Sequence, residues 1–285
     1  MVRGWYTGAS GMRAQEHRLD ALSNNLANAD TTGYKRDVSV HKAFPELLIR
    51  RFSDDGVKRV PLRMDPIGQI DTAPVVGRVG TGVEQNESYT IFEQGSVKQT
   101  ENPFDLALDG EGFFVVNTPY GERLTRNGSF MLGPEGMLVT QEGYPVLGEE
   151  GVIRIRENNF KIDEDGRVME NRALPDDRLI SMTENRWEDA QEVDRLRVVN
   201  VRRPRHLEKQ GSSLLRDTWE SGEPQILEDD IRPTVLQGFL ETSNVNPVSE
   251  MVEMIQVNRA YEANQRVIQT HDELTGRLIN DTMRL

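Results

Sequence analysis

The chain has 285 residues, a formal net charge of −13, no cysteine and only 6% aromatic residues. The acidic excess argues against a nucleic-acid-binding surface, because phosphate binding needs clustered lysine and arginine. The lack of cysteine excludes disulfides, thiolate catalysis and cysteine-ligated metals, and the hydrophobic content of 36% favours an elongated or assembling protein over one dense globule.

The sequence shows neither a membrane span nor a cleaved signal peptide. No apolar run approaches the roughly 18 residues that a spanning helix needs. The opening stretch, MVRGWYTGASGMRAQEHRLD, lacks the apolar core of a secretory signal. We therefore expect no membrane insertion, and we expect any export to proceed without a cleaved signal peptide.

A heptad pattern predicts a long amphipathic helix from about Arg3 to Ala29, within a terminal segment of residues 1–32. Residues seven apart form two lines: Trp5, Met12, Leu19 and Leu26, and then Gly8, Gln15, Leu22 and Ala29. Near the helix end, Asn24, Asn25 and Asn28 surround Leu26. Asparagine is a poor helix-interior residue, so these amides indicate either a frayed helix end or contacts with neighbouring helices.

The next segment, residues 33–72, has little regular pattern and is predicted to be an irregular connector. Charged residues are dense, and Pro45, Pro61 and Pro66 interrupt the segment. Phe44 to Phe52 is compatible with a short helix. A segment of this kind typically becomes ordered against a neighbour.

Residues 73–223 are predicted to form a β-rich middle domain. Short apolar runs recur between glycine-bearing turns such as Asp109-Gly110 and Asn127-Gly128. This spacing is typical of an antiparallel sandwich or barrel. The charged stretch Asp176 to Asp194 indicates a loop or insertion, and residues 224–246 are predicted to be a second irregular connector.

A second long helix is predicted for residues 247–285. Its seam, with alternating gaps of three and four, contains Met254, Val257, Tyr261, Asn264, Ile268, His271, Thr275 and Leu278. Met251, Val252 and Ile255 widen the apolar face near its start. A helix of this length extends roughly 50 Å, which is too long for a small domain to cover, so it needs partner helices.

Together these elements predict an α+β fold. The long N- and C-terminal helices pair as a coiled coil, and an antiparallel all-β domain with irregular connectors is inserted between them. The alternative, on pattern alone, is an ordinary core helix at each end of the chain.

The sequence contains no motif that predicts an enzyme, a cofactor site or a metal site. The four histidines are scattered, with no His-Glu-x-x-His pair. Asp163 and Asp165 fit a turn better than a calcium loop, because Arg167 stands where an oxygen ligand belongs. Acidic pairs such as Glu149-Glu150 leave a cell-wall glycan hydrolase as an alternative function.

Three stretches resemble the bacterial flagellar rod and hook protein family. NNLANADTTGYKR (Asn24 to Arg36) resembles its N-terminal signature, and ETSNVNPVSEMVEMIQVNRAYEANQRVI (Glu241 to Ile268) resembles its C-terminal signature. NPFDLALDGEGFFVV (Asn102 to Val116) is similar to the middle domain of the longer rod members. Tyr144 to Ile155 resembles the proximal-rod form and Arg78 to Gln85 the distal form, and the proximal rod subunit is the preferred prediction.

The resemblance implies a structural subunit of the flagellar basal body, located in the periplasmic rod. It would assemble into a tubular drive shaft for motility, with the terminal helices lining the tube and the β-domain facing outward. Its partners would be copies of itself, other rod proteins and the flagellar export apparatus, with no cofactor and no nucleic acid. A distal rod subunit, the hydrolase and a coiled-coil adaptor remain alternatives.

The residues predicted to mediate self-assembly lie on the two terminal helices. They are Trp5, Met12, Leu19, Leu22, Asn24, Asn25, Leu26, Asn28, Met254, Val257, Tyr261, Asn264, Ile268 and Leu278.

Overall fold

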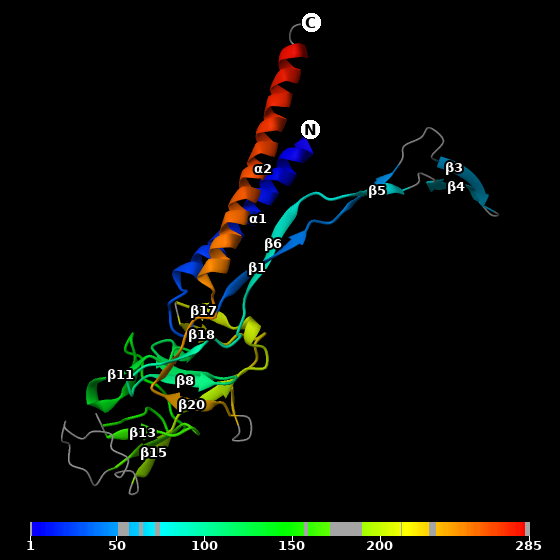
Figure 1. The fold of residues 1–285 in the computed structure, drawn as a ribbon. Helices are drawn as coiled ribbons and strands as arrows, with labels where there is room; N and C mark the ends of the chain where they lie inside the picture. Colours follow the sequence, from blue (N-terminus) through cyan, green and yellow to red (C-terminus); the bar gives the residue numbers. More distant parts are fainter. Residues whose placement is uncertain are drawn as a thin grey trace. The chain divides into compact units, whose positions relative to one another are not determined.

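The computed structural model describes residues 2–50, 57–62, 65–71, 75–156, 159–171, 190–211, 213–227 and 232–282. The fold is α+β, with one helix in each terminal segment and short antiparallel strands between them (Figure 1). Contacts within the chain group it into two compact units. The first contains Met1–Ala21, Ser39–Ser88 and Glu253–Leu285, and the second contains Leu22–Val38 and Tyr89–Val252. The bounds of the five segments predicted from the sequence stay a prediction.

The two long helices predicted from the heptad patterns are present. α1 spans Val2–Ala27 and α2 spans Pro247–Thr282. Asn246 caps α2, because its Oδ1 accepts a hydrogen bond from Val248 N at 3.0 Å. Pro247 is the first residue of α2. A proline suits this position, because the backbone N–H that it lacks would not be hydrogen-bonded within the helix. Over its described residues, neither helix has an apolar stretch long enough to cross a membrane.

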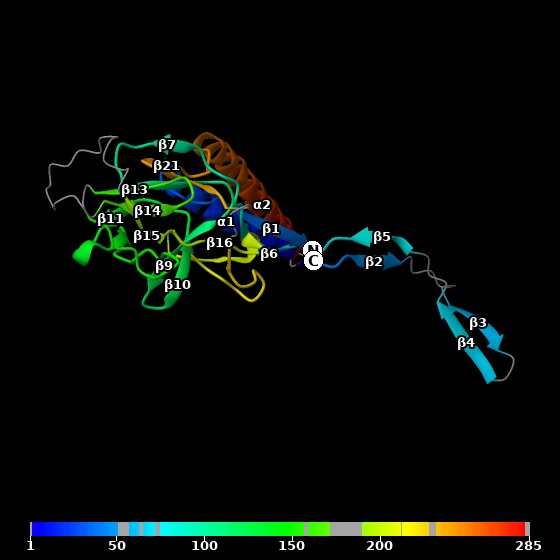
Figure 2. The ribbon, with the colours of Figure 1, turned by 90° about the horizontal axis from the view of Figure 1, so that it is seen from below.

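Three strand pairs lie wholly or mostly in the first unit and are nested along the chain (Figure 2). β1 (Asp37–Ala43) pairs with β6 (Val83–Thr90), β2 (Leu47–Arg50) with β5 (Val75–Val79), and β3 (Val57–Leu62) with β4 (Asp65–Asp71). Ser10 Oγ on α1 accepts a hydrogen bond from Val83 N at 3.3 Å. The returning strand β6 is therefore attached to the first helix.

The prediction of an irregular connector at residues 33–72, with a short helix at Phe44 to Phe52, is wrong for the described residues. The chain forms strands there, and Leu47, Leu48 and Ile49 of β2 are 44% to 54% exposed. A two-stranded ribbon has solvent on both faces, so its residues lack the apolar–polar alternation of a half-buried strand. Backbone pairing holds the ribbon together, and periodicity does not reveal it.

Among the described residues, the second unit contains the remaining strands and two short 3₁₀ helices. They are β7 (Val97–Gln99), β8 (Leu106–Asp109), β9 (Phe113–Thr118), β10 (Gly121–Thr125), β11 (Phe130–Leu132), η1 (Pro134–Gly136), β12 (Leu138–Thr140), β13 (Phe160–Ile162), β14 (Arg167–Glu170), β15 (Gln191–Arg195), β16 (Val198–Asn200), η3 (Pro204–His206), β17 (Glu208–Gln210), β18 (Leu214–Arg216), β19 (Gln225–Ile226), β20 (Thr234–Gln237) and β21 (Phe239–Glu241). The largest sheet has the order β17-β18-β10-β9-β16-β19. β13, β14 and β15 form a second sheet, and β11-β12, β20-β8 and β21-β7 are pairs.

One apolar core joins several of these small sheets. It includes Leu106 of β8, Phe114 of β9, Phe130 of β11 and Phe160 of β13, each at most 3% exposed. The rings of Phe114 and Phe130 meet edge to face with centroids 5.4 Å apart. The β-rich character predicted for residues 73–223 is thus present, whereas the sandwich or barrel stays a prediction.

Two further segments differ from their predictions or lie outside the structure. Residues 224–246, predicted to be irregular, contain β19, β20 and β21. The sequence did not predict these strands, because strands of two to four residues are too short to show apolar–polar alternation. Of the charged loop predicted at Asp176 to Asp194, residues 176–189 lie outside the described residues. Its last residues belong to β15.

Candidate assembly surface

In the first unit, the start of α1 lies against the far half of α2, and the two helices run antiparallel (Figure 1). Gly8 and Gly11 face α2 at helical spacing. A Cβ atom at Gly8 would lie 2.9 Å from Ile268 Cγ1, and one at Gly11 would lie 2.9 Å from Asn264 Nδ2. The glycines therefore allow a close approach of the two helix backbones.

Two further contacts extend this pairing in both directions. The ring of His271 occupies the space beside Gly4, where a Cβ atom would lie 2.8 Å from Cε1. Arg18 and Glu253 form an ion pair at 3.4 Å. Their side chains are 45% and 35% exposed, so this pair contributes little to stability. The glycine contacts bring the two helices close together, and the coiled-coil geometry itself stays a prediction.

The predicted assembly residues divide between buried and exposed positions. Leu22 and Val257 are 4% and 3% exposed, whereas Trp5, Tyr261 and Leu278 are 39%, 36% and 47% exposed. The half-buried residues are Met12, Leu19, Leu26, Asn28, Met254, Asn264 and Ile268. The prediction selected large apolar residues and asparagines of α1. It placed Gly8 on a heptad line but did not single out the spacing of Gly4, Gly8 and Gly11. That spacing of small residues was the available signal for the contacting face.

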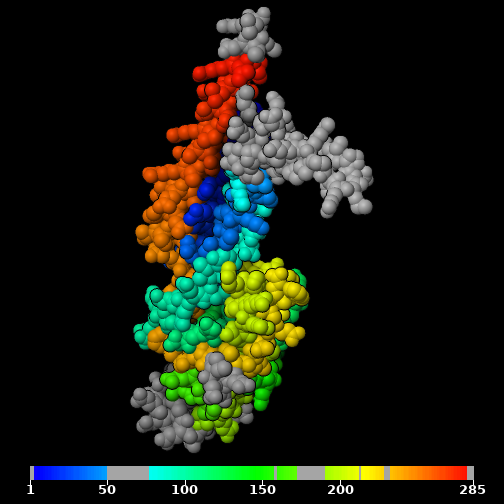
Figure 3. Space-filling model, turned by 90° about the vertical axis from the view of Figure 1, so that its right-hand side faces the viewer, coloured from blue at the N-terminus to red at the C-terminus, as the bar shows by residue number. Residues whose placement is uncertain are grey.

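The opposite side of α2 carries an exposed apolar stripe near the start of the helix. Val248, Met251, Val252 and Ile255 have the i, i+3, i+4, i+7 spacing of one helix face. Their side chains are 50% to 70% exposed, whereas Val257 on the other side is buried. From the sequence, Met251, Val252 and Ile255 were expected to widen the inner face. Figure 3 shows α2, in orange and red, with one flank uncovered in this view.

The three predicted asparagines of α1 fall into two groups. Asn28 Nδ2 donates to Asn24 O at 2.9 Å and to Asn24 Oδ1 at 2.7 Å, which is a local arrangement at a helix end. Asn25 is fully buried, and its Nδ2 donates to Asp37 O at 2.8 Å and to Glu250 Oε2 at 3.2 Å. Its Oδ1 accepts from Asp37 N at 2.9 Å. In one chain, Asn25 therefore joins segments of the same unit, and a role for it in self-assembly stays a prediction.

Charged residues surround Asn25 and complete what we call the helix junction: Asn25, Tyr34, Arg36, Asp37, Lys209 and Glu250. Arg36 Nε lies 2.7 Å from Glu250 Oε1, and Lys209 Nζ lies 2.8 Å from Asp37 Oδ2. Lys209 Nζ also lies 4.0 Å from the centroid of the Tyr34 ring. Burial lowers the pKa of Lys209, and its hydrogen bond to Asp37 opposes this effect.

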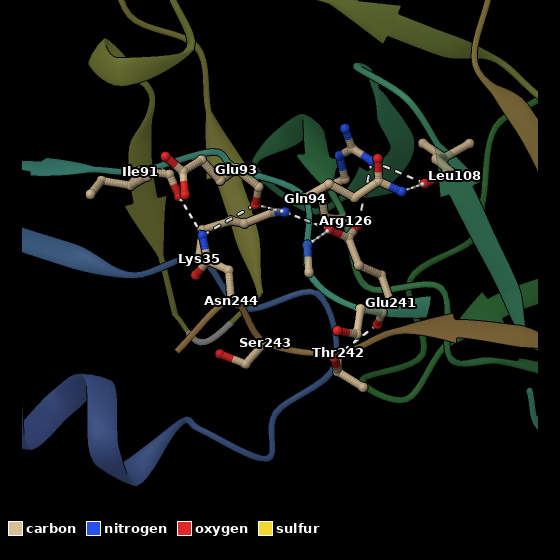
Figure 4. A network of polar contacts seen from close by, with 12 residues as sticks. Lys35, Ile91, Glu93, Gln94, Leu108, Arg126, Glu241, Thr242, Ser243 and Asn244 are labelled. Atoms are coloured by element: carbon tan, nitrogen blue, oxygen red, sulfur yellow. Dashed lines mark hydrogen bonds and ion pairs between the residues drawn. The ribbon is translucent and has the colours of Figure 1, made fainter. Parts of the chain in front are cut away.

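A second group, the Glu241 cluster, consists of Lys35, Arg126 and Glu241 (Figure 4). Lys35 Nζ lies 2.5 Å from Glu241 Oε1, and Arg126 Nη1 lies 3.4 Å from Glu241 Oε2. The three side chains are 3%, 5% and 1% exposed. Buried ions need partners because desolvation is costly, so these contacts connect three distant parts of the second unit.

Sequence reasoning missed both groups, although a signal was present. The N-terminal signature ends with the cations Lys35 and Arg36, and the C-terminal signature contains the acids Glu241 and Glu250. Opposite charges in two stretches expected to meet are candidates for ion pairs. No ion pair among these four charges was predicted from the sequence.

One hollow among the described residues gathers several acidic side chains. It has a volume of about 670 Å³ and is lined in part by Glu135, Glu170 and Asp194. Arg154 pairs with Glu135 at 3.5 Å and Arg156 with Glu170 at 2.9 Å. Asp194 Oδ1 accepts hydrogen bonds from two backbone N–H groups, at 3.1 and 2.7 Å. These acids have structural partners, which does not favour the hydrolase alternative.

Within the part of the chain that the structure describes, no group of three or more His, Cys, Asp or Glu side chains is able to hold a metal ion. The features that the two units do present are packing surfaces and buried ion pairs. They can hold chain segments together and present an apolar helix face.

Three family profiles match this sequence. Residues 6–35 match the family described as flagella basal body rod protein. Residues 107–170 match the flagellar hook protein FlgE/F/G D1 domain. Residues 236–281 match the flagellar basal body rod FlgEFG protein C-terminal family.

Several relatives are similar over their whole length. The flagellar basal-body rod protein FlgG of Buchnera aphidicola subsp. Schizaphis graminum is 34% identical over 282 residues, covering 98% of this chain and 99% of that protein. FlgG of Borreliella burgdorferi is 32% identical over 280 residues, or 97% of each chain. The flagellar hook-basal body complex protein FlhO of Bacillus subtilis is 31% identical over 295 residues, covering 99% of this chain and 98% of that protein.

Proposed function

Because this chain belongs to the family of bacterial flagellar basal-body rod proteins, we propose that it assembles with copies of itself through its terminal helices. It is a structural subunit of the rod and not an enzyme. The predicted family is thereby confirmed, and the hydrolase is not favoured. The coiled-coil adaptor would differ from a rod subunit by forming a small closed oligomer.

The exposed stripe on α2 is the observation that supports self-assembly. Val248, Met251, Val252 and Ile255 remain 50% to 70% exposed in the single chain. Full burial of an exposed apolar side chain is worth roughly 1.5–3 kcal/mol, and covering these partly exposed side chains is worth about half of that for each. If the stripe of one copy contacts a different helix face of the next copy, the contact is heterologous, and repeated contacts that do not close into a ring produce an extended assembly.

The position along the rod is a separate proposal. The proximal rod subunit, preferred from the sequence, stays a prediction. The distal rod subunit is the second candidate. Two of the relatives above carry the name FlgG, which supports this candidate. We also propose that the chain reaches the periplasmic rod unfolded, through the flagellar export apparatus and without a cleaved signal peptide.

The double substitution Met251→Asp and Ile255→Asp tests self-assembly. We expect the purified chain to keep its helical and strand signals in circular dichroism, because both side chains are already about half exposed. Assembly and motility should be lost, since burying an unpaired carboxylate in the contact costs several kcal/mol. The measurements are electron microscopy of basal bodies and swimming in a strain without its own copy of this subunit.

A matched control places the same charges elsewhere on α2. Gln265→Asp and Gln269→Asp have the same spacing, and both positions are exposed and polar. This control should assemble better than the stripe variant. Normal rods from the stripe variant, or equal loss in both variants, would contradict a specific role for the stripe.

A further inference from the structure

The core of the second unit is completed by strands that come late in the chain. β20 pairs with β8, placing Val235 opposite Leu108, and β21 pairs with β7, placing Phe239 opposite Gln99. Val235 is 1% exposed and belongs to the same apolar cluster as Leu108. The early strands β7 and β8 therefore lack these partners until residues 234–241 are in place.

Glu241, at the end of β21, also supplies the carboxylate of the buried cluster. Its Oε1 accepts hydrogen bonds from Lys35 Nζ at 2.5 Å and from Gly95 N at 2.9 Å. Its backbone carbonyl accepts from Gly33 N at 2.8 Å. Figure 4 shows the side chains of Lys35 and Arg126 approaching it from different chain segments. Lys35 is 206 positions from Glu241 along the chain, and Arg126 is 115 positions away.

Without Glu241, two buried cations would lose their shared carboxylate and keep hydrogen bonds to carbonyl oxygens. Lys35 Nζ would keep Glu93 O at 2.7 Å, and Arg126 Nη2 would keep Gly110 O at 2.5 Å. Burial lowers the pKa of both Lys35 and Arg126, and the charge of Glu241 opposes the change in each case. A desolvated cation without its carboxylate strongly disfavours the closed state.

We propose that Glu241 controls the order of folding: the second unit closes around Lys35 and Arg126 only after β21 has paired with β7. A chain whose residues beyond about 232 are not yet available keeps this unit open. The biological use of such a delay rests on the proposed export of an unfolded chain. The folding step itself rests on the contacts above.

The test uses refolding of the full-length chain in solution. Glu241→Gln keeps the shape of the side chain and removes its charge. We expect the equilibrium constant for unfolding of the second unit to rise by about a hundredfold or more, since loss of one buried ion partner is strongly destabilising. In pulse-labelling hydrogen exchange, amides of β9 and β10 should become protected about tenfold more slowly.

A matched control and a rescue separate charge from shape. Glu93→Gln removes an exposed carboxylate, while the backbone carbonyl of Glu93 still accepts from Lys35, so it should change the unfolding constant less than about twofold. Lys35→Met combined with Glu241→Gln returns the cluster to its original formal charge. The equilibrium constant for unfolding of the double variant should be at least about tenfold lower than that of Glu241→Gln alone.

Three results would overturn the proposal. The first is unchanged stability and refolding of Glu241→Gln, and the second is earlier protection of β9 and β10 than of β21 in the wild type. The third concerns the case in which Glu241→Gln does not fold. If the double variant Lys35→Met, Glu241→Gln also stays unfolded, charge is not the cause. If the double variant folds, the result supports the proposal. Refolding needs no rod, so a failure of rod assembly contradicts the proposed function and leaves this result unaffected.

Discussion

At the scale of single residues, the helix junction places a tyrosine hydroxyl in a buried polar setting. Tyr34 Oη donates to Asn25 Oδ1 at 3.3 Å. Burial, followed by the negative charge of Asp37, raises the pKa of Tyr34 well above its ordinary value of 10. The folded chain thus holds this proton more tightly than the unfolded chain. The resulting stability is complete below about pH 10 and is lost as the pH rises above it.

Tyr34→Phe should remove this alkaline sensitivity. At pH 7 the variant should lose about 1 kcal/mol from the missing hydrogen bond. Between about pH 10 and pH 12, the free energy of unfolding should fall less for the variant than for the wild type. Urea denaturation across this pH range measures both effects. Parallel pH profiles for the two proteins would show that the Tyr34 hydroxyl keeps an ordinary pKa.

The contacts of single residues were predictable only where the partner residue is close in the sequence. The contact of Asn28 with Asn24, four residues earlier, matches one of the two readings of the asparagine-rich helix end. The contact of Asn25 with Glu250, at a separation of 225 residues, has no local signature. Helix-end chemistry is therefore readable from neighbours in sequence, whereas the partner of a buried amide is not.

At the scale of elements, small residues on α1 allow its close approach to α2. Gly8 is buried against Ile268. Gly276 of α2 is exposed, and a Cβ atom added there would have no neighbour within 4 Å among the described residues. Two glycines in helices therefore have opposite roles: one allows contact, and the other only costs helix propensity.

Substitution at these two glycines should change helix stability in opposite directions. Gly8→Leu should destabilise the helix pair by about 1–3 kcal/mol, because the added side chain overfills the contact. Gly276→Ala should stabilise α2 by up to about 1 kcal/mol. Thermal melting followed by circular dichroism at the helical band measures both. A neutral Gly8→Leu would mean that the helices do not need this close approach.

The elements themselves were unevenly predictable. Both long helices follow from sustained heptad spacing, since local periodicity defines a helix face. The β2–β5 ribbon has two solvent faces, and the strand β19 is two residues long. Neither has a side-chain pattern, so only backbone pairing in three dimensions reveals them.

At the scale of the whole molecule, the chain is one subunit of a larger structure. Its relatives match it from end to end, so the terminal helices and the β-rich middle are inherited together. The net charge of −13 favours solubility of the single subunit, and the exposed stripe on α2 is the surface that we propose is buried on assembly.

The place of the subunit along the rod is testable by complementation. In the organism that encodes this chain, deleting its gene should arrest the rod at one segment, and a tagged copy should restore it. If the chain fills the distal position, basal bodies from the deletion should retain the proximal rod. If it fills the proximal position, both segments should be missing. Cryo-electron tomography of the basal bodies distinguishes these outcomes, and intact rods in the deletion would exclude both positions.

The sequence by itself determined the two terminal helices, the β-rich centre and the rod family, because periodicity and contiguous signatures are properties of neighbours along the chain. Only the tertiary structure decided that Gly8 and Gly11 face α2, that Met251 and Ile255 face outward, and that Glu241 neutralises Lys35 from 206 positions away. The physical reason is that burial and ion pairing depend on which distant segments meet. A charge or a glycine has the same letter in the sequence whether it is buried in a contact or exposed to solvent.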